Sequence, residues 1–315
     1  MTGVRIPVRA YFIQMEENQN ENKKNWHDRH YKTILIIPII IILFSLIYMF
    51  FFYHNNHDFI HKDISLTGGT SLTLYGQFDT QKIKQDLGPK LKDLNVKEIS
   101  DLVTRKQLAI ILETTTDGDA TKSIVQNYVG YNLTEDNSSF EFTGSSLSDS
   151  FYNQLLIAIL IAFIFMAIVV FFMFRTAVPS GAVIFSAFAD ILMTLVTINI
   201  IGIKMSSAGI IALLMLIGYS VDTDILLTNR LLKRTSGTIN ERLLGAFKTG
   251  ITMTSTSFFA IGVSLLVVKS FSGVLTQIFI ILLIGLVFDV FNTWITNASL
   301  LKWYVQSKSY SMRKK

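Results

Sequence analysis

Long apolar runs dominate the pattern of hydrophobic and polar positions along this chain of 315 residues. A helix of about 20 apolar residues is long enough to cross the roughly 30 Å hydrocarbon core of a bilayer. Six runs of this length occur, at about residues 34–53, 155–174, 178–201, 205–227, 249–268 and 274–295. The pattern therefore predicts a membrane protein with an all-α transmembrane bundle of six helices.

Residues 54–154, between the first two runs, contain no apolar stretch long enough to cross a membrane. Their pattern alternates between strand-like and helix-like segments. Strands are predicted at residues 70–77, 97–104, 106–113 and 138–143, and helices at 79–94 and 119–128. The order β-α-β-β-α-β is that of a ferredoxin-like α+β domain. We therefore expect one such domain between helices 1 and 2.

Basic residues are distributed unevenly around the six runs. Six precede the first run and five follow the fourth, whereas the short loops that alternate with these regions carry one each, Lys204 and Lys269. Loops rich in Lys and Arg stay in the cytoplasm. Residues 1–33 are therefore predicted to be a cytoplasmic segment and 302–315 a basic cytoplasmic tail. The domain at 54–154 is then extracytoplasmic, on a multi-pass protein of the cell membrane.

The composition excludes several kinds of chemistry. The chain has no cysteine, so disulfides and thiolate chemistry are absent. Its net charge of +5 includes no basic patch interleaved with aromatic residues, so no nucleic-acid partner is expected. His54, His57 and His61 lie close together in the sequence, but solvated histidines at the membrane interface are favoured over a metal site. Neither a metal nor another cofactor is predicted.

Four aspartates interrupt the apolar runs, and they are the candidate proton relay: Asp190, Asp222, Asp224 and Asp289. A carboxylate inside a bilayer is costly unless it faces the bundle interior, a partner or water. In the predicted orientation, Asp222 and Asp289 each lie about five residues, or ~7 Å, on the cytoplasmic side of the midpoint of their helix. We therefore expect these two side chains to lie side by side. Helix-to-helix hydrogen bonding without ion flow remains the alternative.

Hydroxyl side chains at a similar depth complete the predicted polar layer between helices 4, 5 and 6. The candidates are Ser220, Thr254, Ser255 and Ser257. Ordinary packing of small residues between membrane helices is the alternative for the helix 5 hydroxyls. Asp222 and Asp224 point about 200° apart around their helix, so one should face the bundle and the other a groove or subunit interface.

Two short motifs resemble those of a known family. Thr67-Gly68-Gly69-Thr70 stands where the chain enters the extracytoplasmic domain, and Gly218-Tyr219-Ser220 is followed by Arg230 in the fourth run. Together with the architecture, they resemble SecF of the archaeal type, in the SecD/SecF family of the resistance-nodulation-division superfamily. The bacterial pattern has aspartate where this chain has Ser65. In helix 4, the carboxylates of the bacterial pattern are also displaced by one position relative to Asp222 and Asp224 of this chain.

The resemblance implies an accessory subunit of protein export rather than an enzyme. It implies a SecD-like partner subunit, a SecY-type translocation channel and a translocating secretory polypeptide, with the proton gradient as the driving force and H⁺ as the coupling ion. A half-transporter that exports lipid or small molecules is the alternative with the same fold. An intramembrane aspartyl protease is disfavoured because its Gly-x-Gly-Asp motif does not occur in the sequence. Arg230 is interpreted as a topology anchor at the headgroups.

Overall fold

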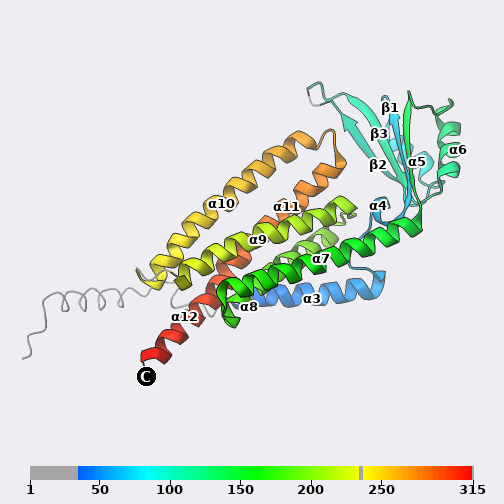
Figure 1. The fold of residues 1–315 in the computed structure, drawn as a ribbon. Coiled ribbons are helices and arrows are strands. Elements are labelled where there is room, and N and C mark those ends of the chain that lie inside the picture. The colour runs from blue at the N-terminus through cyan, green and yellow to red at the C-terminus, as the bar shows by residue number, and fades with distance from the viewer. Residues whose placement is uncertain (1–34, 102, 234–236, 314–315) are drawn as a thin grey trace, which may run out of the picture.

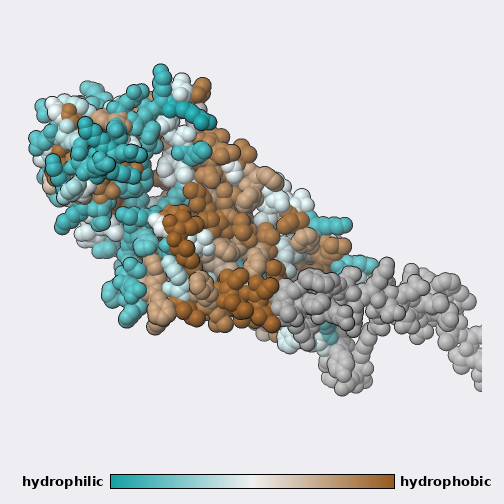
Figure 2. Space-filling model, turned by 180° about the vertical axis from the view of Figure 1, so that it is seen from behind, coloured by the Kyte–Doolittle hydropathy of each residue, from teal (hydrophilic) through white to brown (hydrophobic). Residues whose placement is uncertain are grey.

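The computed structural model describes residues 35–101, 103–233 and 237–313, and these form a helical body with a small sheet domain at one end (Figure 1). The helices lie side by side, and the C-terminal helix ends at the opposite end from the sheet. The predicted cytoplasmic segment 1–33 lies outside the described residues. Figure 2 shows apolar residues gathered over the helical body and polar residues over the sheet domain.

Six helices of the described chain are long and apolar enough to cross a membrane, which confirms the six expected spans. They are α3 (Ile36–Asn56), α7 (Ser145–Phe174), α8 (Ala177–Ile201), α9 (Ser207–Lys233), α10 (Ile239–Val268) and the continuous helical stretch that begins with α11 (Gly273–Phe291). The protein is therefore a multi-pass membrane protein.

Two of these helices begin well before their apolar runs. α7 begins at Ser145 and α10 at Ile239, whereas the runs begin at residues 155 and 249. A capping box explains the start of α10, because the Thr238 hydroxyl accepts the Glu241 amide and the Glu241 carboxylate accepts the Thr238 amide. Polar first turns thus extend both helices beyond their apolar runs.

The last membrane helix also continues past its predicted end at residue 295. After α11 the chain forms a π-helix, η1 (Asn292–Asn297), and then α12 (Ala298–Arg313). A π-helix has i to i+5 hydrogen bonds and a wider turn than an α-helix. The tail that was expected to begin at residue 302 is helical as far as Arg313.

The sheet domain, residues 69–143, consists of four antiparallel strands and two helices. Along the chain they are β1 (Gly69–Tyr75), α5 (Thr80–Leu87), β2 (Asn95–Ser100), β3 (Gln107–Thr114), α6 (Gly118–Val129) and β4 (Ser138–Thr143). The strand order is β2-β3-β1-β4, so β2 and β4 form the two edges. The element order is the one that the sequence predicts.

Strict alternation gives the sheet two different faces. Leu72 and Leu74 of β1 are fully buried against α5 and α6, together with Ile110 and Leu112 of β3. The intervening positions, such as Ser71 of β1, point to the opposite face, because successive side chains of a strand alternate. One face is therefore the domain core and the other is polar and open.

Two boundaries in the sheet domain differ most from the prediction. The first helix was expected to reach residue 94, but α5 ends at Leu87, because Pro89 has no N–H group to continue the helical hydrogen bonds. The strand pair was expected to turn at residues 105 and 106, but β2 ends at Ser100 and β3 begins at Gln107. The Asp101 carboxylate accepts the amides of Val103 and Thr104 in the longer connection.

The two chain links between the sheet domain and the helices lie against each other. Asp63 caps the short helix α4 (Ile64–Thr67) through the Ile64 amide. Gly68 and Gly69 follow with φ of +78° and +147°, a region that favours glycine. A Cβ atom at Gly68 would lie 2.6 Å from the Cα of Ser145, where α7 begins. The Gly-Gly motif thus permits the segment that leads into the sheet domain to pack closely against the segment that leaves it.

We predict that Gly68→Ala destabilises the protein by roughly 1–3 kcal/mol, because it adds both the clash and the cost of the positive φ. The measurement is thermal unfolding of the purified membrane protein. Gly181→Ala in α8 is the matched control, since a Cβ there meets no atom within 4 Å. The control should be neutral or slightly stabilising; equal melting temperatures for the two variants would contradict the packing role.

Candidate functional site

Three of the four membrane aspartates meet inside the helical bundle. Asp190 comes from α8, Asp224 from α9 and Asp289 from α11, and each is at most 1% exposed. We call these three residues the carboxylate cluster. Asp224 lies about 6 Å from the middle of α9, towards the end remote from the sheet domain.

Neutral side chains hold Asp190. Its Oδ2 accepts the hydroxyl of Ser220 at 2.5 Å, and its Oδ1 accepts the amide of Asn292 at 2.6 Å. These donors come from α9 and η1, so Asp190 joins three segments of the bundle. Ser220, a residue predicted to support a polar layer between helices 4, 5 and 6, is buried and donates to Asp190 of α8 instead.

A single hydroxyl lies between the other two carboxyl groups. Thr293 Oγ1 is 2.9 Å from Asp224 Oδ1 and 3.2 Å from Asp289 Oδ1. A hydroxyl has one proton, so Thr293 can donate to only one of them at a time. Asn297 also donates to Asp224, at 2.7 Å, and Thr223 to Asp289, at 2.9 Å.

The cluster lacks compensating positive charge. None of the ion pairs found among the described residues involves Asp190, Asp224 or Asp289. The Oδ2 atoms of Asp224 and Asp289 are buried and have no hydrogen-bond partner in the described part of the chain. Adjacent buried carboxylates cannot all be ionised, because burial and mutual repulsion both penalise the charged form. The arrangement is chemically suited to holding and releasing protons.

The π-helix supplies most of the neutral donors. Asn292, Thr293 and Asn297 all belong to η1 and are buried. π-helical turns are rare and occur frequently at functional sites. None of these three residues was predicted from the sequence. Two asparagines and a threonine beside Asp289, at the end of an apolar run, are the signal that was available.

Close helix contact sets the geometry of the cluster. Gly285 of α11 leaves no room for a side chain, since a Cβ there would lie 2.4 Å from Leu216 of α9. This contact draws α9 and α11 together about one turn from Asp289. Thr223 of α9 can therefore reach the Asp289 carboxylate.

The expected pairing of Asp222 with Asp289 is wrong. Asp222 is exposed, whereas its neighbours Thr223 and Asp224 are buried. A step of two residues rotates a side chain by about 200°, so only one of the two aspartates can face the bundle. That one is Asp224. Asp222 lies instead in a shallow surface pocket with Asn229 and Arg230.

The helix 5 hydroxyls do not complete the polar layer as expected. Thr254 and Ser255 line a small groove between α10 and α11 with Phe258 and Leu286, and Ser257 is half-buried. None of the hydrogen bonds described for the cluster comes from these three residues. The donors come from α9 and η1, because those segments, rather than α10, face the aspartates.

The remaining motif residues lie on the surface of α9 or at its end. Gly218 and Tyr219 are exposed. The Arg230 guanidinium bonds to the Gly245 carbonyl at 2.5 Å and to the Thr249 hydroxyl at 2.8 Å, both on α10. Arg230 thus ties α9 to α10, a contact that the interpretation as a headgroup anchor did not include.

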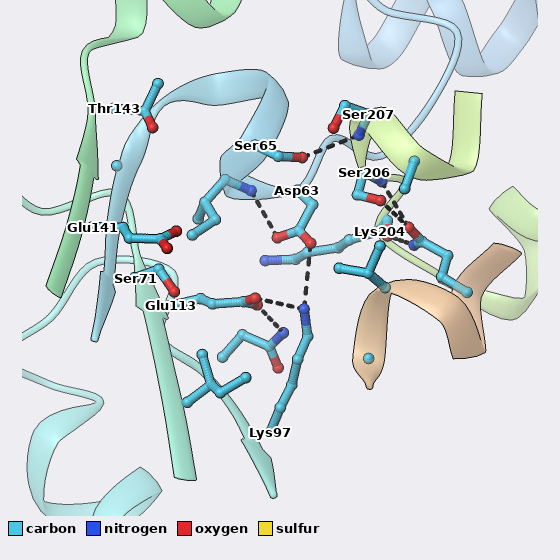
Figure 3. Close-up of a pocket in the computed structure, with 18 of the residues that line it drawn as sticks. Asp63, Ser65, Ser71, Lys97, Glu113, Glu141, Thr143, Lys204, Ser206 and Ser207 are labelled. Atoms are coloured by element: carbon cyan, nitrogen blue, oxygen red, sulfur yellow. Dashed lines mark hydrogen bonds and ion pairs between the residues drawn. The ribbon is translucent and has the colours of Figure 1, made fainter. Parts of the chain in front are cut away.

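A second polar region lies between the open face of the sheet and the ends of the helices. It is a cleft of about 770 Å³, and Figure 3 shows its charged residues. Lys97 of β2 contacts Glu113 at 2.6 Å and Asp63 at 3.4 Å, which connects the sheet to the segment before α4. Lys204 extends into the cleft from the helical side, and Glu141 of β4 lies across from it.

The described histidines form no metal site. No group of three His, Cys, Asp or Glu residues in the described part of the chain is arranged to hold a metal ion. The ring of His61 contacts the ring of Phe52 edge-on, with centroids 4.8 Å apart.

Six membrane helices, a four-stranded sheet domain and a buried carboxylate cluster define a multi-pass membrane protein with titratable groups at its centre. Residues 122–307 match the family described as "Protein export membrane protein SecD/SecF, C-terminal". The chain belongs to this SecD/SecF family, among its archaeal SecF members.

Curated relatives support the assignment. The chain is 40% identical to the protein-export membrane protein SecF of Methanocaldococcus jannaschii over 254 residues, which cover 78% of this chain and 88% of the relative. It is 52% identical to SecF of Thermococcus gammatolerans over 150 residues, 48% of this chain and 47% of the relative.

Two solved structures share the fold. The crystal structure of SecDF from Thermus thermophilus, described as a translocon-associated membrane protein, has a TM-score of 0.68 and 14% identity and covers 87% of this chain. A SecDF structure in a super-membrane-facing form has a TM-score of 0.58 and 16% identity and covers 89%. This chain spans only 38% and 39% of those two proteins.

Thr293→Val should destabilise the bundle by roughly 1–3 kcal/mol, because it removes the hydroxyl shared by two buried carboxyl groups while keeping the shape. Thermal unfolding in a single detergent measures the effect. Thr197→Val is the control, since the Thr197 hydroxyl donates only to the Met193 carbonyl of its own helix. An equal loss of stability in both variants would mean that the hydroxyl shared by the two carboxyl groups stabilises the bundle no more than an ordinary helix hydroxyl does.

Proposed function

We propose that this chain is an accessory subunit of the Sec protein-export machinery. It acts with a SecD-like subunit to promote the translocation or release of secreted chains across the cell membrane, driven by the proton gradient. The observation that supports this proposal is the carboxylate cluster: three buried carboxyl groups in the membrane, held by neutral donors. Membership of the SecD/SecF family indicates protein export as the process. The carboxylate cluster is the proposed site at which the proton gradient is coupled to it.

Protons are the coupling ions that this chemistry favours. One charge that crosses the membrane potential supplies ~2.3 kcal/mol per 100 mV. The position of a proton on Asp224 or Asp289 determines which of them needs the Thr293 hydroxyl. Each protonation state therefore favours a different hydrogen-bond arrangement between α9 and the α11–η1 helix. We propose that this change moves the helices and, through them, the sheet domain.

The positive-inside rule supports cytoplasmic termini and an extracytoplasmic sheet domain. Arg230, Lys233 and Arg242 all lie at the end of the bundle remote from the sheet. The element order and the strand order β2-β3-β1-β4 support a ferredoxin-like fold for residues 69–143. We propose that secretory polypeptides emerge from a SecY-type channel on the same side of the membrane as the sheet domain.

The exposed stripe on α9 supports a partner subunit. It contains Ile211, Met215, Gly218, Tyr219 and Asp222, at helical spacing. An aspartate that faces lipid inside the membrane is costly, so a helix with a hydrogen-bond donor should cover it. A SecD-like subunit is the partner that the family implies.

Asp224→Asn should abolish the dependence of export on the proton gradient, because an amide cannot exchange a proton at the cluster. The assay follows secretion of a reporter protein, with and without an uncoupler, in cells whose only copy of the subunit is the variant. Asp149→Asn, an exposed position at the start of α7, is the control and should behave as wild type. Gradient-dependent export by the Asp224→Asn variant would contradict the relay.

Cross-linking can test the partner surface, because the chain has no native cysteine. Tyr219→Cys, in the exposed stripe of α9, should form a cross-link to a co-purifying membrane subunit. Val263→Cys, on the exposed side of α10, is the matched lipid-facing control and should not. Mass spectrometry identifies the attached subunit. Equal cross-linking from both positions would contradict a specific interface on α9.

A half-transporter for lipid or small molecules is the second candidate. The groove between α10 and α11, about 290 Å³ in volume, favours it, because apolar side chains such as Phe259 and Val287 line it and the groove is open at the surface. Filling the groove with Ser255→Phe distinguishes the two functions. Lipid export would fall, whereas protein export would continue. We propose no enzymatic activity for either function.

A further inference from the structure

One edge of the sheet is unprotected. β2 is partly covered, since the amide of Ser100 donates to the carbonyl of Ser270 in the link between α10 and α11 at 2.7 Å. β4, at the other edge, pairs only with β1. Edge strands are usually protected by charged side chains, especially lysine, by proline or by a bulge. The six residues of β4 include neither lysine nor proline, the one charged side chain, Glu141, lines the cleft, and the pairing with β1 is regular.

The register identifies the backbone groups that β4 leaves free. The Tyr75 amide donates to the Asn137 carbonyl at 3.0 Å, so residues 75 and 137 are a hydrogen-bonded pair. Such pairs alternate along an antiparallel ladder. Residues 139 and 141 therefore bond to β1, and the N–H and C=O groups of Phe140 and Phe142 point outward. None of the hydrogen bonds found in the described residues uses these groups.

The side chains of β4 differ on its two faces. Phe140 and Phe142 are 41% and 52% exposed, beside the start of α6 at Gly118. Ser139, Glu141 and Thr143 line the polar cleft of Figure 3, opposite Lys204. A strand added at this edge would place alternate side chains against two aromatic rings and towards a hydrophilic cleft.

We propose that the β4 edge binds an extended segment of polypeptide by strand addition, and that the occupant is a secretory chain. Free backbone donors and acceptors in strand geometry match another extended backbone, whatever its side chains. A site for unfolded chains of varied sequence needs this tolerance. The proposal rests on the proposed export function, because export would bring such unfolded chains to the side of the membrane on which the sheet domain lies.

The binding test uses the full-length protein in nanodiscs and a fluorescent peptide of roughly ten residues, with alternating valine and threonine. We expect binding to be roughly tenfold weaker for the same peptide with alternate amides N-methylated, because methylation removes donors that strand addition needs. Equal binding of the two peptides, or no binding of either, would overturn the proposal.

A protein variant tests the same contact from the other side. Phe142→Pro removes an outward N–H group without removing a bond to β1, and it should weaken peptide binding by roughly tenfold. Phe142→Ala keeps the backbone donor and should weaken it less. Thermal unfolding of each variant checks that the sheet is intact. If the alanine and proline variants bind equally well, backbone pairing is not the mode of binding.

Photo-cross-linking in cells identifies the occupant. A photoreactive phenylalanine analogue at Phe142 should attach to an arrested secretory chain, whereas the same group at Leu108, an exposed position of β3, should not. Cross-links to a neighbouring membrane subunit instead would overturn the proposal. Export that still requires this protein, without cross-links to the secretory chain, would refute the β4 site alone. Export that does not require the protein would refute the proposed function.

Discussion

The structure depends on the burial of three carboxyl groups among neutral donors. Desolvation makes a charged carboxylate costly in the membrane, and neighbouring carboxylates make each other more costly. Asp190, Asp224 and Asp289 are tolerated because Ser220, Thr223 and the amides of η1 bind them. These groups come from α8, α9 and the α11–η1 stretch, which the cluster joins. The addition or loss of one proton in such a site changes which hydrogen bonds its carboxyl groups can make.

Much of the fold could be predicted from the sequence because it depends on length and alternation. Apolar runs of about 20 residues located the six spans, and alternation located four strands. The boundaries were less accurate. Polar capping residues such as Thr238 and Glu241 extended α10 beyond its apolar run, and Pro89 shortened α5.

The sequence predicted which residues could form the candidate site but not which way their side chains point. Charged residues are rare within apolar runs, so all four aspartates were identified, and three of them meet in the bundle. Depth alone could not decide between Asp222 and Asp224, since both lie at nearly the same level. Rotation about α9 decides it, and the rotation is determined by packing, in particular by the contact of Gly285 with Leu216. The donors of η1 were missed because a π-turn depends on tertiary context.

One further consequence follows from the way the sheet is attached. β4 continues through the single residue Gly144 into α7, a helix of 30 residues that is little covered by its neighbours. β4 and α7 should therefore move together as a nearly rigid unit. A small change in the tilt of α7 within the membrane would cause a larger displacement of β4, because β4 lies beyond the end of this long helix.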